Sequence, residues 1–143
     1  MAQATEPRYQ LQSVMSYENA LTVVDRLADG LGKAIDEKIR PLVAVMIMCD
    51  IETRMSCEGH ATRSRPHPWV TVSLGQEAKL NCLLGWQNRP GPANNPNHNQ
   101  WVLESHPHGW CVTPRNLDQP LDVLQRYALE FAERIQLMLN ISR

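Results

Sequence analysis

Apolar side chains recur at helical spacing along the C-terminal part of the chain, and this repeat constrains the fold more than any other feature. They are Leu121, Leu124, Ala128, Phe131, Ile135 and Met138. Because an α-helix has about 3.6 residues per turn, these side chains share one face. The pattern predicts a long amphipathic helix, with Asp118 as its N-cap and Pro120 in its first turn, whose apolar face needs a second layer to cover it.

Two shorter helices are predicted in the N-terminal part. Apolar residues repeat at helical spacing over residues 20–35, and Ser16 ahead of them is a typical N-cap. Two glycines inside this segment leave open whether it forms one helix or two. Pro41 suits the first turn of a helix, so the apolar run 42–48 predicts a short buried helix, with a strand as the alternative.

Four short segments show the patterns of strands. Residues 51–56 and 69–74 alternate apolar and polar side chains, which indicates two half-buried strands that pair antiparallel. Residues 100–105 and 110–113 predict a second pair, joined by a tight turn that contains Pro and Gly. The fold class that follows is α+β: a small four-stranded antiparallel or mixed sheet, covered by the N-terminal helices and the long C-terminal helix.

The segment between the two strand pairs predicts a helix and then a long loop. Residues 76–86 place leucines on one face, whereas Pro, Gly and Asn dominate residues 87–99. Loops of this length in a compact domain are usually functional or disordered, so we expect a contact surface here and on the connection between the first two strands. The candidate partner-binding residues are His67, Trp86, Arg89 and Trp110.

Length and charge limit the classes of protein to consider. A chain of 143 residues suits one domain, expected over 16–143 after a flexible lead-in of 1–15. With 14 basic and 15 acidic side chains, the formal net charge of −1 excludes nucleic-acid binding driven by charge alone. The longest apolar run, 42–48, is too short to span a membrane, and no secretory signal is expected at the N-terminus. We therefore expect a cytoplasmic protein.

Two Cys–His pairs share one spacing. Cys57 and His60 stand three positions apart across a glycine, and His108 and Cys111 repeat that spacing in the reverse order. A two-residue spacer lets both side chains of a pair point to one ion, so the four residues predict a tetrahedral zinc site. The alternative is that both cysteines are small buried residues at strand ends and both histidines belong to turns, without a cofactor. The other two cysteines lie in apolar helical segments and are expected in the core.

A catalytic interpretation uses some of the same residues. Cys57 would act as a thiolate nucleophile, His60 or His108 as its base, and Glu58 as the group that orients the base. A catalytic Cys and its His are usually distant in sequence, however, and a Cys and a His three residues apart on a turn often point away from each other. A non-enzymatic protein is therefore the expectation.

A group of small bacterial and phage-borne accessory proteins resembles this chain in three segments: Arg40-Pro-Leu-Val, Ile51-Glu-Thr-Arg-Met-Ser-Cys-Glu-Gly-His60 and Pro68-Trp-Val. These proteins share a helix, a T-x-x-S-C-E-G-H strand and turn, a P-W-V strand and a long C-terminal helix. The strand and turn are also distantly similar to the Thr-x-x-Ser-Cys-Ser-Gly-Arg motif of the wybutosine-synthesis methyltransferase family, which has Ser and Arg where this chain has Glu58 and His60. The resemblance implies a shared architecture only. It does not imply that this chain transfers methyl groups or binds the cofactor of that reaction.

Members of that group often look like products of accessory genes of phages and other mobile elements. The resemblance therefore implies a protein that binds and inhibits a host protein, for example a CRISPR or other defence component. The alternative is a metal- or nucleotide-dependent enzyme or ligand-binding domain built around the turn 56–60, from Ser56 to His60. A host protein is the expected partner, and a nucleotide is a possible ligand. The chain is expected to be a monomer or a homodimer. We expect no membrane binding and no strong binding of nucleic acid.

Overall fold

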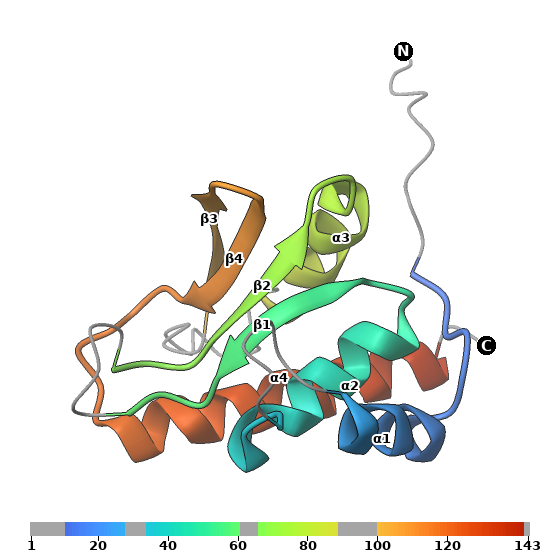
Figure 1. Cartoon of the computed structure of the whole chain (residues 1–143), viewed down its shortest axis with the longest axis horizontal. Coiled ribbons are helices and arrows are strands. Elements are labelled where there is room, and N and C mark those ends of the chain that lie inside the picture. Colours follow the sequence, from blue (N-terminus) through green and yellow to red (C-terminus); the bar gives the residue numbers. More distant parts are fainter. Residues whose placement is uncertain (1–10, 28–33, 61–65, 89–99, 142–143) are drawn as a thin grey trace.

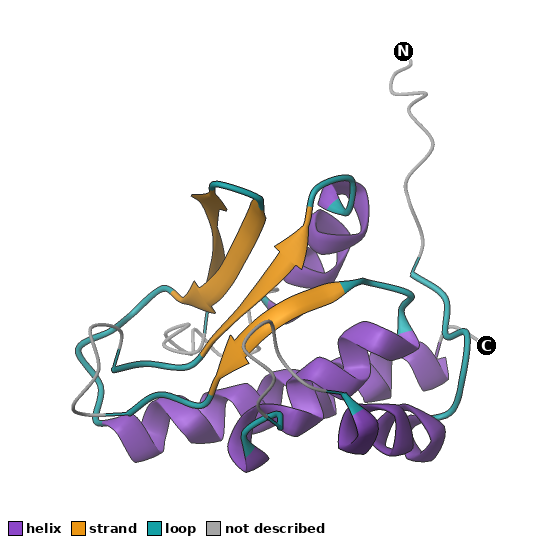
Figure 2. Cartoon of the chain, in the orientation of Figure 1, coloured by secondary structure: helices purple, strands orange, loops and turns teal. Residues whose placement is uncertain are grey.

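The computed structural model describes residues 11–27, 34–60, 66–88 and 100–141, which form helices and four strands (Figures 1 and 2). In chain order the elements are α1 (Tyr17–Arg26), the 3₁₀ helix η1 (Glu37–Ile39), α2 (Arg40–Met48), β1 (Thr53–Cys57), β2 (Trp69–Ser73), α3 (Glu77–Gln87), β3 (Trp101–His106), β4 (Gly109–Pro114) and α4 (Leu121–Ile141). This arrangement confirms the predicted α+β class.

The four strands form one antiparallel sheet in the order β1-β2-β4-β3. β3 and β4 make a hairpin, and β4 also pairs with β2, so the second strand pair completes the sheet begun by the first. The pairing of β1 with β2 contains an irregularity between Thr53 and Ser56. There the Thr71 hydroxyl accepts a hydrogen bond from Met55 N at 2.9 Å and donates one to Met55 O at 3.2 Å, which satisfies backbone groups that a regular ladder would pair.

The helices α1, α2 and α4 lie on one side of the sheet (Figure 1). α2 packs against α4 and β1, α1 packs against α2, and α3 packs against α4 and β3. The aromatic rings of Trp101, at the start of β3, and Phe131 on α4 meet edge to face, with their centroids 5.2 Å apart. The core therefore lies between the sheet and a helical layer made mainly by α2 and α4.

α2 is buried along almost its whole length, as its apolar sequence predicts. Residues 42–46 are fully buried and Pro41 lies in the first turn, so the strand alternative for this run is wrong. A helix that is apolar all round needs neighbours on every side, and α1, α4 and the sheet supply them. None of the helices in the described ranges has both the length and the apolar character that a membrane span requires.

Two predicted helix boundaries differ from the structure. The Ser16 hydroxyl caps α1 by accepting a hydrogen bond from Asn19 N, as predicted, but α1 ends at Arg26, and Ile35 is buried outside any helix. The two glycines in that segment lie outside the described residues. At the C-terminal helix, the Pro120 carbonyl accepts hydrogen bonds from Val123 N and Leu124 N. Pro120 therefore directly precedes the first helical residue, and the prediction of Asp118 as N-cap is wrong.

The apolar repeat of α4 faces the core. Leu124, Ala128, Phe131 and Ile135 are buried, and Ala132 and Leu139 join them on the same face. Leu121 and Met138, at the two ends of the repeat, are only partly covered. The helical period thus identified the buried face of α4.

We predict that Phe131→Ala lowers the free energy of unfolding by about 3–5 kcal/mol, because it removes a fully buried ring that contacts Trp101 and leaves a cavity. Leu137→Ala is the matched control on the same helix, because Leu137 is 60% exposed, and it is expected to change the stability by about 0.5 kcal/mol or less. Urea denaturation followed by tryptophan fluorescence measures both. Equal losses in the two variants would contradict this assignment of the core face.

Candidate functional site

Three side chains with different donor atoms converge where β1 ends. Asp36 directly precedes η1, Cys57 is the last residue of β1, and His60 follows the turn after it. A carboxylate oxygen, the thiol sulfur and an imidazole nitrogen of these residues all lie within 4.8 Å of one another. We call this set the Asp-Cys-His cluster. It joins two segments of the chain that lie apart in sequence.

The turn between Cys57 and His60 depends on Gly59. Its φ of +92° lies in the left-handed region, and its N–H donates a hydrogen bond to Cys57 Sγ at 3.3 Å. A Cβ at this position would lie 2.6 Å from Leu121 Cδ1 and 2.9 Å from the carbonyl carbon of His67. Glycine is thus required both by the backbone conformation and by the space available.

Asp36 is held in place by the same turn. Its Oδ2 accepts a hydrogen bond from Glu58 N at 3.1 Å and lies 3.3 Å from His60 Nε2. The carboxylate therefore contacts the turn through the backbone as well as through the imidazole. This arrangement fixes the oxygen donor next to the nitrogen and sulfur donors.

Glu58, predicted as an orienting group, lies beside the cluster and supports it. Its Oε1 accepts a hydrogen bond from Lys38 N at 2.9 Å, which satisfies one of the unpaired N–H groups at the start of η1. Its backbone oxygen accepts a hydrogen bond from Gln125 Nε2 at 3.1 Å. Glu58 thus links the turn to the segment before α2 and to α4.

The burial of the cluster is uneven. Cys57 is 4% exposed, whereas the side chains of His60 and Asp36 are 36% and 33% exposed. The sulfur therefore faces the interior, and the nitrogen and oxygen donors lie toward solvent. A metal ion held by the three would have its remaining coordination position on the open side, where a water molecule or an external ligand can reach it.

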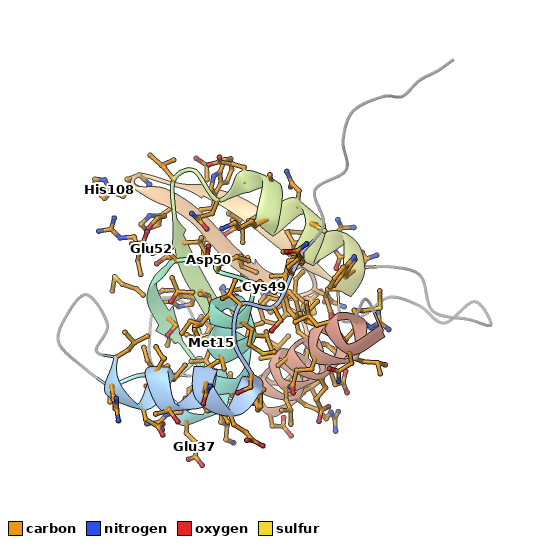
Figure 3. All side chains as sticks on the ribbon, turned by 90° about the vertical axis from the view of Figure 1, so that its right-hand side faces the viewer. Met15, Glu37, Cys49, Asp50, Glu52 and His108 are labelled. Atoms are coloured by element: carbon orange, nitrogen blue, oxygen red, sulfur yellow. The ribbon has the colours of Figure 1, made fainter. Side chains whose placement is uncertain are left out.

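The turns of the two predicted Cys–His pairs lie at opposite ends of β2, and Cys111 pairs with Thr71 in the middle of that strand. In the ladder, Cys57 pairs with Trp69 at one end of β2, whereas Gly109, next to His108, pairs with Ser73 at the other end. Figure 3 shows His108 far from Glu37, the neighbour of Asp36. Within the described residues, the structure thus brings Cys57 and His60 together with Asp36, and it leaves His108 and Cys111 outside the cluster.

Sequence reasoning missed Asp36. The residue stands 21 positions before Cys57, and no spacing rule connects the two. The only local signal is that Asp36 precedes a helical segment, a position where an aspartate is usually explained as an N-cap. In the structure its side chain makes no capping hydrogen bond to η1 and turns to the Cys57–His60 turn instead.

Three of the four predicted partner-binding residues lie within the described part of the chain. His67 is half-buried, and its backbone is close to Gly59. Trp86 on α3 and Trp110 on β4 are also half-buried and pack against the core. Trp110 Nε1 donates a hydrogen bond to Glu77 Oε1 at 2.8 Å, and this bond, together with one from Gly75 N, lowers the pKa of the Glu77 carboxyl. Arg89 lies outside the described residues.

The two cysteines predicted for the core take no part in the cluster. Cys49 directly follows α2 and is buried. This burial, with the nearby Cys82 thiol, raises the pKa of the Cys49 thiol to about 12. A thiol with this pKa is protonated at neutral pH and is a poor nucleophile there. Among the described residues, Cys57 is the cysteine that lies together with other candidate metal ligands.

Comparison with protein-family models, with curated proteins and with solved structures gives no significant match to this chain.

We predict that Gly59→Ala lowers the free energy of unfolding by about 1–3 kcal/mol more than Gly75→Ala does. Both glycines have a positive φ, +92° and +88°, so both substitutions carry the same backbone strain, of about 1–2 kcal/mol. Only at Gly59 does the new Cβ meet other atoms, since nothing lies within 4 Å of a Cβ at Gly75. Chemical denaturation measures the difference, and equal losses would show that the turn tolerates a side chain.

Proposed function

We propose that the protein binds a zinc ion through Asp36, Cys57 and His60. The observation that carries the proposal is the convergence of one oxygen, one sulfur and one nitrogen donor, all within 4.8 Å of one another. Two of these donors come from a turn whose geometry requires glycine, and the third is anchored by a backbone hydrogen bond. Each donor is therefore held by contacts of its own.

The donor set favours zinc over other common ions. Ca²⁺ and Mg²⁺ prefer oxygen ligands, so a site with one thiol and one imidazole suits them poorly. Zn²⁺ accepts sulfur at about 2.3 Å and nitrogen or oxygen at about 2.0–2.2 Å, usually in a tetrahedron. The N–H of Gly59 already donates to Cys57 Sγ, which is the kind of outer contact that stabilises a metal-bound thiolate.

Three protein ligands leave one position of a tetrahedron for an external group. In zinc proteins this pattern is typical of sites that bind water or substrate, whereas structural sites use four protein ligands. We therefore propose a metal-dependent ligand-binding or catalytic domain, in which the ion polarises a bound water or substrate oxygen on the side of Asp36 and His60. Glu58 would act as a positioning residue and not as a metal ligand, because its carboxylate already accepts a hydrogen bond from Lys38 N.

We expect protein purified without a metal-affinity step to carry one zinc per chain, measured by native mass spectrometry and elemental analysis. Cys57→Ser and His60→Ala each remove a ligand, so each is expected to lower zinc affinity by more than the roughly 10–100-fold that loss of an outer-shell partner causes. Asp36→Asn, which keeps the shape and removes the charge, is expected to weaken binding as well. Circular dichroism checks that the variants remain folded.

His108→Ala is the matched control. His108 belongs to the second Cys–His pair, is exposed and lies outside the cluster, so its loss is expected to leave zinc content unchanged. A zinc-free wild-type protein that does not take up added zinc would overturn the proposal. Loss of zinc in His108→Ala would instead favour the four-residue site drawn from the sequence.

Inhibition of a host defence protein, the function implied by the resemblance to phage accessory proteins, stays a prediction beside this proposal. A zinc site is compatible with it, because a metal centre can order a small binding domain. A cytoplasmic location fits both proposals, since all four cysteines are thiols and Cys57 must stay reduced to bind an ion.

A further inference from the structure

A second feature of the molecule is a pocket of about 380 Å³ between the start of α2 and the first half of α4. The segments that form it come from opposite ends of the sequence. Its lining residues are Glu37, Lys38, Pro41, Asp122, Gln125, Arg126 and Leu129. None of them belongs to the Asp-Cys-His cluster. The volume lies within the range of small-molecule sites in proteins, toward its lower end.

The charges around this pocket balance. Lys38 and Arg126 are cations and Glu37 and Asp122 are anions, so the lining has no net charge. Among the described residues, none of these four side chains makes a hydrogen bond or an ion pair, although Asp122 and Arg126 are one helical turn apart. Two unpaired cations and two unpaired anions thus border the same small space.

Two of the lining segments are fixed by Glu58. Gln125 Nε2 donates a hydrogen bond to Glu58 O, and Lys38 N donates one to Glu58 Oε1. The walls contributed by α4 and by η1 are therefore both tied to the same residue. The remaining lining is apolar and consists of Pro41 and the side chain of Leu129, which is 43% exposed.

We propose that this pocket binds a small zwitterion, a free α-amino acid with an apolar side chain. Its carboxylate would pair with Lys38 and Arg126, and its ammonium with Glu37 and Asp122. Its side chain would cover Leu129 and Pro41. A phosphate or another multiply charged anion would be repelled by the two carboxylates, and an uncharged ligand would leave all four charges without a partner.

A smaller hollow on the sheet offers less to a ligand. It measures about 230 Å³ and is lined by Met55, Trp69, Thr71 and His106. The Thr71 hydroxyl is already engaged by both backbone groups of Met55, so few directional contacts remain there. Of these two pockets, the one between α2 and α4 is bordered by four charged side chains, whereas the hollow on the sheet has none among its lining residues.

Leucine and two analogues test the charge requirement directly. 4-Methylpentanoate lacks the ammonium group and 3-methylbutylamine lacks the carboxylate, while both keep the branched alkyl chain. We expect leucine to bind in isothermal titration calorimetry and both analogues to bind at least about tenfold more weakly, because each loses charge-assisted hydrogen bonds. Equal affinity for leucine and either analogue would overturn the proposal, as would no leucine binding at millimolar concentration.

Substitution of two charged residues on α4 tests whether the ligand binds in this pocket. Arg126→Gln and Asp122→Asn are each expected to weaken leucine binding about tenfold, whereas Arg26→Gln, which removes an exposed charge from α1, is expected to leave it unchanged. Unchanged binding in both α4 variants would overturn the assignment of the pocket.

The pocket proposal and the zinc proposal can fail separately. Cys57→Ser removes a zinc ligand but no pocket residue, so we expect it to lose zinc and to bind leucine as the wild type does. A folded Cys57→Ser protein that no longer binds leucine would contradict a separate site for the amino acid. A wild-type protein that binds leucine but neither contains zinc nor takes up added zinc would overturn the zinc proposal and support the pocket.

Discussion

Two hydrogen bonds that run in opposite directions hold the turn after β1 to the segment before α2. Glu58 N donates to Asp36 Oδ2, and Lys38 N donates to Glu58 Oε1. The first bond places a carboxylate beside Cys57 and His60, and the second satisfies the start of η1. Since Gln125 also donates to Glu58 O, one residue of the turn positions both the metal-binding cluster and a wall of the neighbouring pocket.

The sequence predicted the fold better than the site, and the reason is physical. The apolar repeat of α4 reports burial on one face of a regular element, and burial is what drives this packing. A shared spacing, and not a burial pattern, identified Cys57 and His60, which are close in sequence. It failed for His108 and Cys111, because an equal spacing does not show to which end of a sheet a turn belongs. The strand order and register decide that, and they depend on pairing between distant segments.

Sequence patterns could not predict the role of Asp36 or the pocket, for the same reason. Asp36 stands 21 positions before Cys57 in the chain, and the pocket brings Lys38 together with Arg126 from the last helix. Neither arrangement leaves a periodic or local signal. Glu58, by contrast, belongs to the T-x-x-S-C-E-G-H motif. Its role as a link between segments follows only from its three hydrogen bonds.

The most direct test of the metal centre is X-ray absorption spectroscopy at the zinc edge on the wild-type protein. Ligation by Asp36, Cys57 and His60 predicts a single sulfur neighbour at about 2.3 Å, with nitrogen and oxygen neighbours at about 2.0–2.2 Å. A spectrum with two sulfur neighbours would require a second cysteine such as Cys111. It would contradict the convergence of Asp36, Cys57 and His60 as the centre of this molecule's chemistry.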